Sequence, residues 1–137
     1  MSIRTASIAK SATGISVTGG TATALSVLTS ASNSLRTMLS DATNLLDRVV
    51  MEFSVKEPSR NNGSPGGMTQ SRNKVVVTLP FTKTVNGVLI SNPTKVTIEV
   101  SCDVEATVAQ KLEARLVGAQ LLADTDFAGF FNSSSLD

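Results

Sequence analysis

The side chains that most often carry catalysis or bind metal ions are scarce in this sequence of 137 residues. It contains 0 His, so the usual general base near neutral pH and the commonest metal ligand are both missing. Cys102 is the single cysteine, and one thiol makes neither an internal disulfide nor a thiolate metal site. Glu52 and Glu99 are the only candidate carboxylate pair. We therefore expect no catalytic residue, no metal ion, no cofactor and no enzymatic activity.

A second set of side chains suits contact with a polyanion. The formal net charge of +1 gives no long-range field, so any such site must be a local patch. The strand pattern described next places five cations against two anions on one face: Arg48, Lys56, Arg72, Lys74 and Lys95 against Glu52 and Glu99. Hydroxyl groups lie between them, at Ser54, Thr78, Thr97 and Ser101. This mixture suits phosphate and ribose contacts, but an ordinary solvated sheet face carries the same residues, and that alternative stays open.

Three segments bring these side chains to one face because they alternate between apolar and polar residues, as half-buried strands do. They are residues 48–56, 71–79 and 94–102. Their apolar positions are Val49, Met51, Phe53 and Val55, then Val75, Val77 and Leu79, then Val96, Ile98, Val100 and Cys102. Pro80 is expected to end the second strand. Clean alternation favours antiparallel pairing, since parallel strands read as continuous apolar runs.

Weaker signals surround these strands. Gly19-Gly20 separates two alternating runs and predicts a hairpin within residues 1–33, with a disordered polar arm as the alternative. Residues 34–39 favour a further short strand, and residues 59–70 predict a long mobile loop between two strands.

Two helices are predicted in residues 103–131. Asp103 is the expected N-cap of a helix over residues 104–123. Its apolar stripe comprises Val104, Val108, Leu112, Leu116 and Ala119. Gly118 inside this helix hints at close packing. Thr125 or Asp126 is expected to cap a second, short helix, before a polar tail over residues 132–137.

The order of several antiparallel strands followed by two C-terminal helices predicts an α+β fold in a single domain over residues 1–137. The sheet, with an N-terminal hairpin and about five further strands, is too wide for one helix to cover. An uncovered apolar face exceeds what monomers usually expose. We therefore predict an interlocked dimer in which Val108, Leu112 and Leu116 lie at the interface.

The sequence also gives an expectation about compartment. No run approaches the roughly 18–20 apolar residues of a membrane span, and residues 1–10 lack the apolar region of a secretory signal. We expect a protein made in the cytoplasm, with no membrane or small-molecule partner.

At this point the sequence resembles the coat proteins of the single-stranded RNA bacteriophages, the levivirus-like family, over nearly its whole length. The local similarities are Val77-Thr78-Leu79-Pro80, Thr84-Val85-Asn86-Gly87-Val88 and Gln120-Leu121-Leu122. The resemblance implies an interlocked dimer with one continuous sheet, helices lying over the partner, and an icosahedral shell around genomic RNA. It also implies that Asn86 and Gly87 lie in a loop that makes contacts between dimers.

The same resemblance implies an RNA stem-loop on the inner sheet face, for packaging and translational repression. The positions that carry over as RNA-binding are Ser54, Lys56, Arg72, Lys74, Lys95 and Thr97, beside Glu52, Val76, Thr78 and Glu99. The chain has 0 Tyr, so a family aromatic that stacks on a loop base has no equivalent, and Val76 stands where a cation is expected. A non-viral structural or fibre subunit without RNA binding is the alternative that the Ser- and Thr-rich composition also fits.

Overall fold

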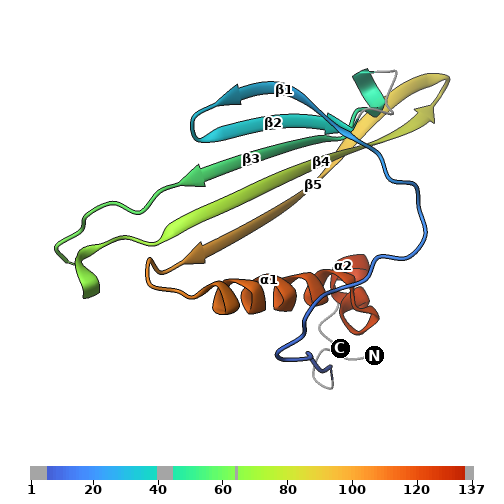
Figure 1. The fold of residues 1–137 in the computed structure, drawn as a ribbon. Helices are drawn as coiled ribbons and strands as arrows, with labels where there is room; N and C mark the ends of the chain where they lie inside the picture. The colour runs from blue at the N-terminus through green and yellow to red at the C-terminus, as the bar shows by residue number, and fades with distance from the viewer. Residues whose placement is uncertain (1–5, 40–44, 64, 135–137) are drawn as a thin grey trace. The chain divides into compact units, whose positions relative to one another are not determined.

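A computed structural model describes residues 6–39, 45–63 and 65–134 of the chain. Five strands and two helices follow one another in the order that the sequence predicts, namely β1 (Leu25–Ala31), β2 (Ser34–Leu39), β3 (Val50–Lys56), β4 (Ser71–Val85), β5 (Val88–Cys102), α1 (Val108–Ala123) and α2 (Ala128–Ser133). The strands form one antiparallel sheet in the order β1-β2-β3-β4-β5 (Figure 1). The predicted α+β class, with an antiparallel sheet before two C-terminal helices, is confirmed.

The chain divides into two compact units. One unit is the sheet, Gly20–Val104, and the other combines Met1–Gly19 with the helical segment Glu105–Asp137. The single domain expected from the sequence stays a prediction.

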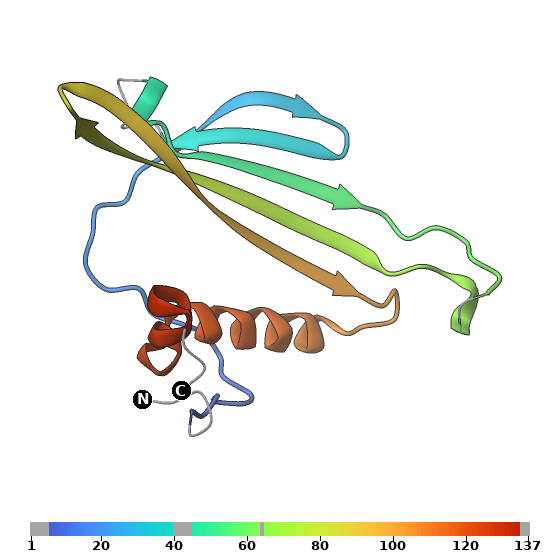
Figure 2. The ribbon, with the colours of Figure 1, turned by 180° about the vertical axis from the view of Figure 1, so that it is seen from behind.

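Register gives the sheet its two chemically different faces. Phe53 lies opposite Val75, and Val75 lies opposite Ile98, so the apolar sets of the three long strands share one face. Ser54 lies opposite Lys74, and Lys74 lies opposite Glu99, on the other face. Both views of the ribbon show these strands side by side in a twisted sheet (Figure 2). The predicted alternation therefore holds across all three strands.

The N-terminal hairpin differs from the expectation. In the described residues before Leu25 there is no strand, although Gly19 and Gly20 have φ values of 78° and 75°. The hairpin is instead β1–β2, which turns at Ser32 and Asn33, so the described residues hold five strands in all. The reason is that the alternating run after Gly20 pairs with residues 34–39 and not with the run before it.

Pro80 does not end its strand, contrary to the sequence expectation. β4 continues to Val85 and β5 begins at Val88, with Pro80 directly opposite Pro93. The pairing of β3 with β4 extends only as far as Val50 and Thr78, so beyond that point no strand requires an N–H from Pro80 on the β3 side. The long β4–β5 hairpin thus extends past the rest of the sheet.

The β3–β4 connection is more ordered than a mobile loop. Arg60 and Met68 form an isolated β-bridge, and the Asn61 N–H donates to the Gly67 carbonyl at 2.9 Å. The Thr69 N–H donates to the Ser59 carbonyl at 2.8 Å. The connection is therefore a continuation of the β3–β4 hairpin.

Helix α1 begins four residues later than predicted. Its N-cap is Thr107, whose hydroxyl accepts from the Gln110 N–H at 3.2 Å, while the Gln110 side chain accepts from the Thr107 N–H at 2.9 Å. This reciprocal capping box satisfies two free donors at once, which a lone Asp103 cap does not. Leu112, Leu116 and Ala119 are half-buried, whereas Val108 is 83% exposed.

Polar contacts hold the other segments of the helical unit together. Gln120 binds the Ala9 peptide at both ends, since its Oε1 accepts from Ala9 N at 2.9 Å and its Nε2 donates to Ala9 O at 3.0 Å. Neither Thr125 nor Asp126 caps α2, whose N-cap is Phe127 without a side-chain hydrogen bond, while Asp124 caps the preceding 3-10 turn Thr125–Phe127. Among the described residues, a Cβ on Gly118 would meet nothing within 4 Å, so no close packing seen there explains this glycine.

Candidate nucleic-acid interface on the sheet

The polar face of the sheet brings the predicted RNA-binding residues into neighbouring rows. Lys56 and Arg72 lie directly opposite each other, one row away from Ser54 and Lys74. Strands rise about 3.3 Å per residue, so Lys95, which pairs with Thr78, lies roughly 20 Å along the sheet from the Arg72 row. Thr97 lies between the two, opposite Val76. The predicted cations therefore form a strip along β3, β4 and β5 and not one compact cluster.

Among the residues that the structure describes, two ion pairs cross this face. Arg36 Nε lies 3.2 Å from Glu52 Oε1, and Arg72 Nε lies 3.9 Å from Glu99 Oε1. All four side chains are between 41% and 58% exposed, so these pairs contribute little to stability. They leave the guanidinium groups accessible to a bound anion.

Arg36 was missed by the sequence reasoning, which placed no side chain of β2 on this face. Its position follows from the register, because Arg36 pairs with Glu52. The alternation of Ser34 and Arg36 with Leu35 and Thr37 is the signal that could have found it. Arg48, in contrast, precedes β3 and is half-buried, with its Nε shielded and without a hydrogen-bond partner among the described atoms.

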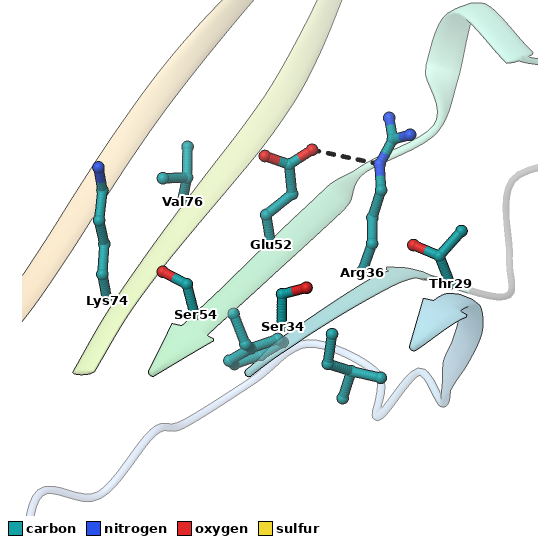
Figure 3. Close-up of a pocket in the computed structure, with 9 residues that line it drawn as sticks. Thr29, Ser34, Arg36, Glu52, Ser54, Lys74 and Val76 are labelled. Atoms are coloured by element: carbon teal, nitrogen blue, oxygen red, sulfur yellow. Dashed lines mark ion pairs between the residues drawn. The ribbon is translucent and has the colours of Figure 1, made fainter. Parts of the chain in front are cut away.

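An open hollow of about 350 Å³ lies on the same face (Figure 3). Its lining residues come from β1, β2, β3 and β4, and they are Thr29, Ser34, Leu35, Arg36, Glu52, Phe53, Ser54, Lys74 and Val76. In the close-up Glu52 stands between Arg36 and Lys74, and the hydroxyls of Ser34 and Ser54 lie below it. Cationic groups at two sides with hydroxyl and carboxylate acceptors between them can hold a phosphate and a polar base edge together.

The opposite, apolar face of the sheet is largely uncovered by the sheet unit itself. Val55 is 47% exposed and Ile98 is 39% exposed. Among the described residues of this unit only Thr37 is buried, at 2% exposure. Such a face forms part of a hydrophobic core, and so contributes to stability, only when another layer of protein covers it.

The tip of the β4–β5 hairpin carries the predicted inter-dimer residues Asn86 and Gly87. Both have positive φ, 51° and 78°, as the two central residues of a type I′ turn require. Apolar side chains around the tip are exposed, with Phe81 at 60%, Val88 at 62% and Leu89 at 51%. The tip is therefore an apolar surface on a strand pair that extends beyond its neighbours.

Other kinds of site find little support in the part of the chain that the structure describes. No group of three or more His, Cys, Asp or Glu side chains there is placed to hold a metal ion. No helix there is long and apolar enough to cross a membrane.

Comparison with known proteins places this geometry in context. No family model matches the sequence, and no curated protein matches it. Among solved structures, the virus-like particle of bacteriophage GQ-907 superposes with a TM-score of 0.83 at 28% identity, covering 99% of this chain and 100% of that one. The virus-like particle of Beihai levi-like virus 21 gives 0.67 at 16% identity, covering 88% of this chain and 93% of that one. That of bacteriophage AVE019 gives 0.63 at 12% identity, with coverages of 82% and 86%. The two more distant structures share the fold, and the first matches the chain end to end.

Proposed function

We propose that this chain, which resembles the coat proteins of the single-stranded RNA phages over nearly its whole length, is the structural capsid protein of such a phage. The observation that carries the proposal is the match to the GQ-907 particle subunit over 99% of this chain at a TM-score of 0.83. In this function the protein makes a closed icosahedral shell and resides in the virion, after synthesis in the cytoplasm of the bacterial host. Its work is assembly and binding, not catalysis.

The first step of assembly is an interlocked dimer. The uncovered apolar face, with Val55 and Ile98 exposed, supports a covering layer from outside the sheet. Leu112 and Leu116 lie on one side of α1, and Val108 extends that side with 83% exposure. In the dimer the α1 helix of each copy covers the sheet of the other, and these three side chains lose their contact with water.

The second step joins dimers into a shell. The β4–β5 hairpin tip at Asn86 and Gly87 supports this role, since it combines a narrow turn with exposed apolar neighbours. Contacts made by such a tip bury apolar surface between dimers while the hairpin bends to suit different symmetry environments.

The polar sheet face binds the genome in this proposal. Lys56, Arg72, Lys74 and Lys95 bind backbone phosphates of an RNA stem-loop, and Ser54 and Thr97 contact loop bases. The exposed strip of cations and the adjoining hollow support this assignment. Binding of a genomic stem-loop there favours packaging and represses translation of the message that contains it.

Electron microscopy of the protein expressed in bacteria, combined with nuclease digestion, tests the proposal. We expect closed shells of uniform size that protect RNA from added ribonuclease until the shells are opened by denaturant. Filaments free of nucleic acid would favour the alternative of a fibre subunit. Soluble monomers would contradict both assembly and the dimer.

A further inference from the structure

The N-terminal arm, defined as residues 6–19, belongs to the helical unit and not to the sheet unit that follows it in the chain. Its side chains Ile8 and Ala12 are half-buried, whereas Val17 is 91% exposed. Both ribbon views show the blue N-terminal segment passing the C-terminal end of α1 (Figure 1, Figure 2). Between residues 13 and 24 the described chain forms no backbone-to-backbone hydrogen bond. The arm is therefore held near its start and has no regular secondary structure after it.

Gln120 of α1 makes the contact that holds the arm. Its Oε1 accepts from the Ala9 N–H at 2.9 Å, and its Nε2 donates to the Ala9 carbonyl at 3.0 Å and to the Leu116 carbonyl at 3.3 Å. Among the described residues, the two bonds to Ala9 are the only hydrogen bonds that join residues 6–24 to the rest of the chain. A carboxamide presents a donor and an acceptor side by side on one planar group, which neither an ionised carboxylate nor an ammonium group does.

The strength of this contact suits reversible fastening. Both bonds to Ala9 lie at exposed positions, where water competes for the same groups. The net contribution of a neutral hydrogen bond to stability is small. Folded proteins open locally at free energies well below that of global unfolding. The arm can therefore detach from Gln120 while α1 stays folded.

The chain joins the helical unit to the sheet unit twice, after Gly19 and after Val104. The second junction leads into the N-terminal end of α1, whereas Gln120 lies in the last turn of that helix, which ends at Ala123. We infer that Gln120 anchors the N-terminal arm so that both junctions are fixed to α1, and that this anchoring slows the exchange of subunits between dimers. The inference rests on the proposed interlocked dimer, in which α1 covers the sheet of the partner.

The physical reason is the path by which α1 leaves the partner's sheet. With its 16 residues, α1 is about 24 Å long. A helix held only at its N-terminal end can detach turn by turn from the other end, losing few contacts at each step. With the arm anchored at Gln120, the C-terminal end is held as well, and more contacts must be lost at the same time. The barrier to dissociation is then higher, so the anchor acts on a rate.

Tryptic cleavage after Lys10 tests the anchor itself. Lys10 is exposed and follows the anchored peptide directly. When opening is fast, the cleavage rate follows the population of the open form. For Gln120→Ala we expect cleavage after Lys10 to be about tenfold faster, because two neutral hydrogen bonds of modest net strength are lost. Intact-mass spectrometry over a time course measures the loss of residues 1–10.

Two features of this experiment make it specific. Alanine is the best helix former, so faster cleavage in Gln120→Ala cannot come from a weaker α1. Gln70→Ala makes the same chemical change at an exposed position of the β3–β4 connection, and it should leave the cleavage rate unchanged. An unchanged cleavage rate in Gln120→Ala would overturn the anchor.

Subunit exchange tests the consequence for the dimer. Isotopically labelled dimers are mixed with unlabelled dimers, and native mass spectrometry follows the appearance of dimers of mixed mass. We expect Gln120→Ala to exchange about threefold to tenfold faster than the original protein, and Gln70→Ala to exchange at the original rate. Deleting residues 1–10 removes the anchored peptide and leaves α1 unchanged, so exchange should again be faster. Adding Gln120→Ala to that deletion should have no further effect, because the two changes remove the same contact.

The outcomes separate this inference from the proposed function. Shells that form normally while Gln120→Ala leaves the exchange rate unchanged overturn the inference and leave the coat-protein proposal intact. An effect of Gln120→Ala that persists in the chain without residues 1–10 also overturns it, because the arm is then not involved. An original protein that is monomeric and forms no shells overturns the proposed function itself, and with it the dimer whose exchange is measured.

Discussion

Lys56 and Arg72 face each other across β3 and β4, an arrangement that destabilises an isolated sheet because like charges lie directly opposite. A phosphate bound between them would relieve that repulsion. The free energy released in this way would add to the affinity of the protein for an anion. Ser54 and Lys74 form the next row and extend the same surface toward the hollow beside Glu52. In the proposed function, this row of unfavourable charge pairing is therefore where we expect an RNA phosphate to bind.

Removing two cations from the strip should weaken RNA binding in a salt-dependent manner. For Lys74→Ala combined with Lys95→Ala, we expect the slope of log affinity against log salt to fall in magnitude by about 1.4–1.8, since each lost phosphate contact contributes about 0.7–0.9. Fluorescence anisotropy with a short RNA hairpin over a series of salt concentrations measures this slope.

Two controls make that measurement specific. Lys83→Ala removes a cation from the hairpin extension, at a position whose side chain alternates to the opposite face, and should leave the slope unchanged. Ser54→Ala or Thr97→Ala should relax sequence preference with little change in slope. An unaltered slope in the Lys74 and Lys95 double variant would show that the polar face is only a solvated surface.

At the residue scale, alternation alone predicted which face of the sheet each residue proposed to bind RNA occupies. It could not predict distances along the sheet, because those depend on register between strands far apart in the sequence. Alternation within residues 34–39 separates Arg36 from Leu35 and Thr37, but only the pairing of Arg36 with Glu52 shows that it shares the polar face of β3.

At the element scale, the start of α1 is a property of its capping box. Replacing Thr107 with Ala removes the hydroxyl that accepts from Gln110 N–H at 3.2 Å. We expect the free energy of unfolding to fall by about 1 kcal/mol, the usual cost of losing an N-cap. Urea denaturation followed by circular dichroism measures the change, and Thr107→Ser, which keeps the hydroxyl, should stay within about 0.3 kcal/mol of the original protein. Equal losses in both variants would contradict the capping assignment.

The β4–β5 turn is the element on which assembly is expected to depend. Asn86 and Gly87 both have positive φ, and alanine at these positions is strained by about 1–2 kcal/mol per residue. Changing both to Ala should leave the dimer intact and reduce the yield of closed shells severalfold, as measured by size-exclusion chromatography and electron microscopy. Asn86→Gly keeps the turn conformation accessible and is the matched control. Normal shells at normal yield from the double variant would remove the assembly role from this turn.

The ends of elements could be predicted from the sequence where a local rule determined them. They could not be predicted where the pairing of one strand with another determined them. Pro80 was expected to end β4, yet it lies opposite Pro93 where β3 no longer needs its N–H. Gly19-Gly20 has the composition of a hairpin turn, but the following run pairs forward with β2. The Thr107 and Gln110 capping box was readable from the sequence and was passed over for the more obvious Asp103.

At the scale of the whole molecule, the sequence order of strands and helices predicted the α+β class because β3, β4 and β5 alternate with a clear period of two and residues after Cys102 do not. What it cannot specify is which copy supplies the cover for each sheet, since the same apolar pattern serves contacts within a chain and between chains. Only one side chain is buried among the described residues of the sheet unit. We therefore expect a second copy of the chain to cover its apolar face.

Charging the apolar side of α1 should therefore abolish the dimer and not merely shell closure. Leu112→Asp or Leu116→Asp would place a carboxylate in a desolvated interface, at a cost of more than about 3 kcal/mol per copy. Analytical ultracentrifugation of freshly purified protein should show loss of soluble dimer, with aggregation or unfolding in its place. Ala114→Asp adds the same charge at an exposed position of the same helix and should leave the dimer in place. A stable, folded monomer from either leucine variant would contradict the interlocked dimer, because an uncovered sheet would then have been shown to fold alone.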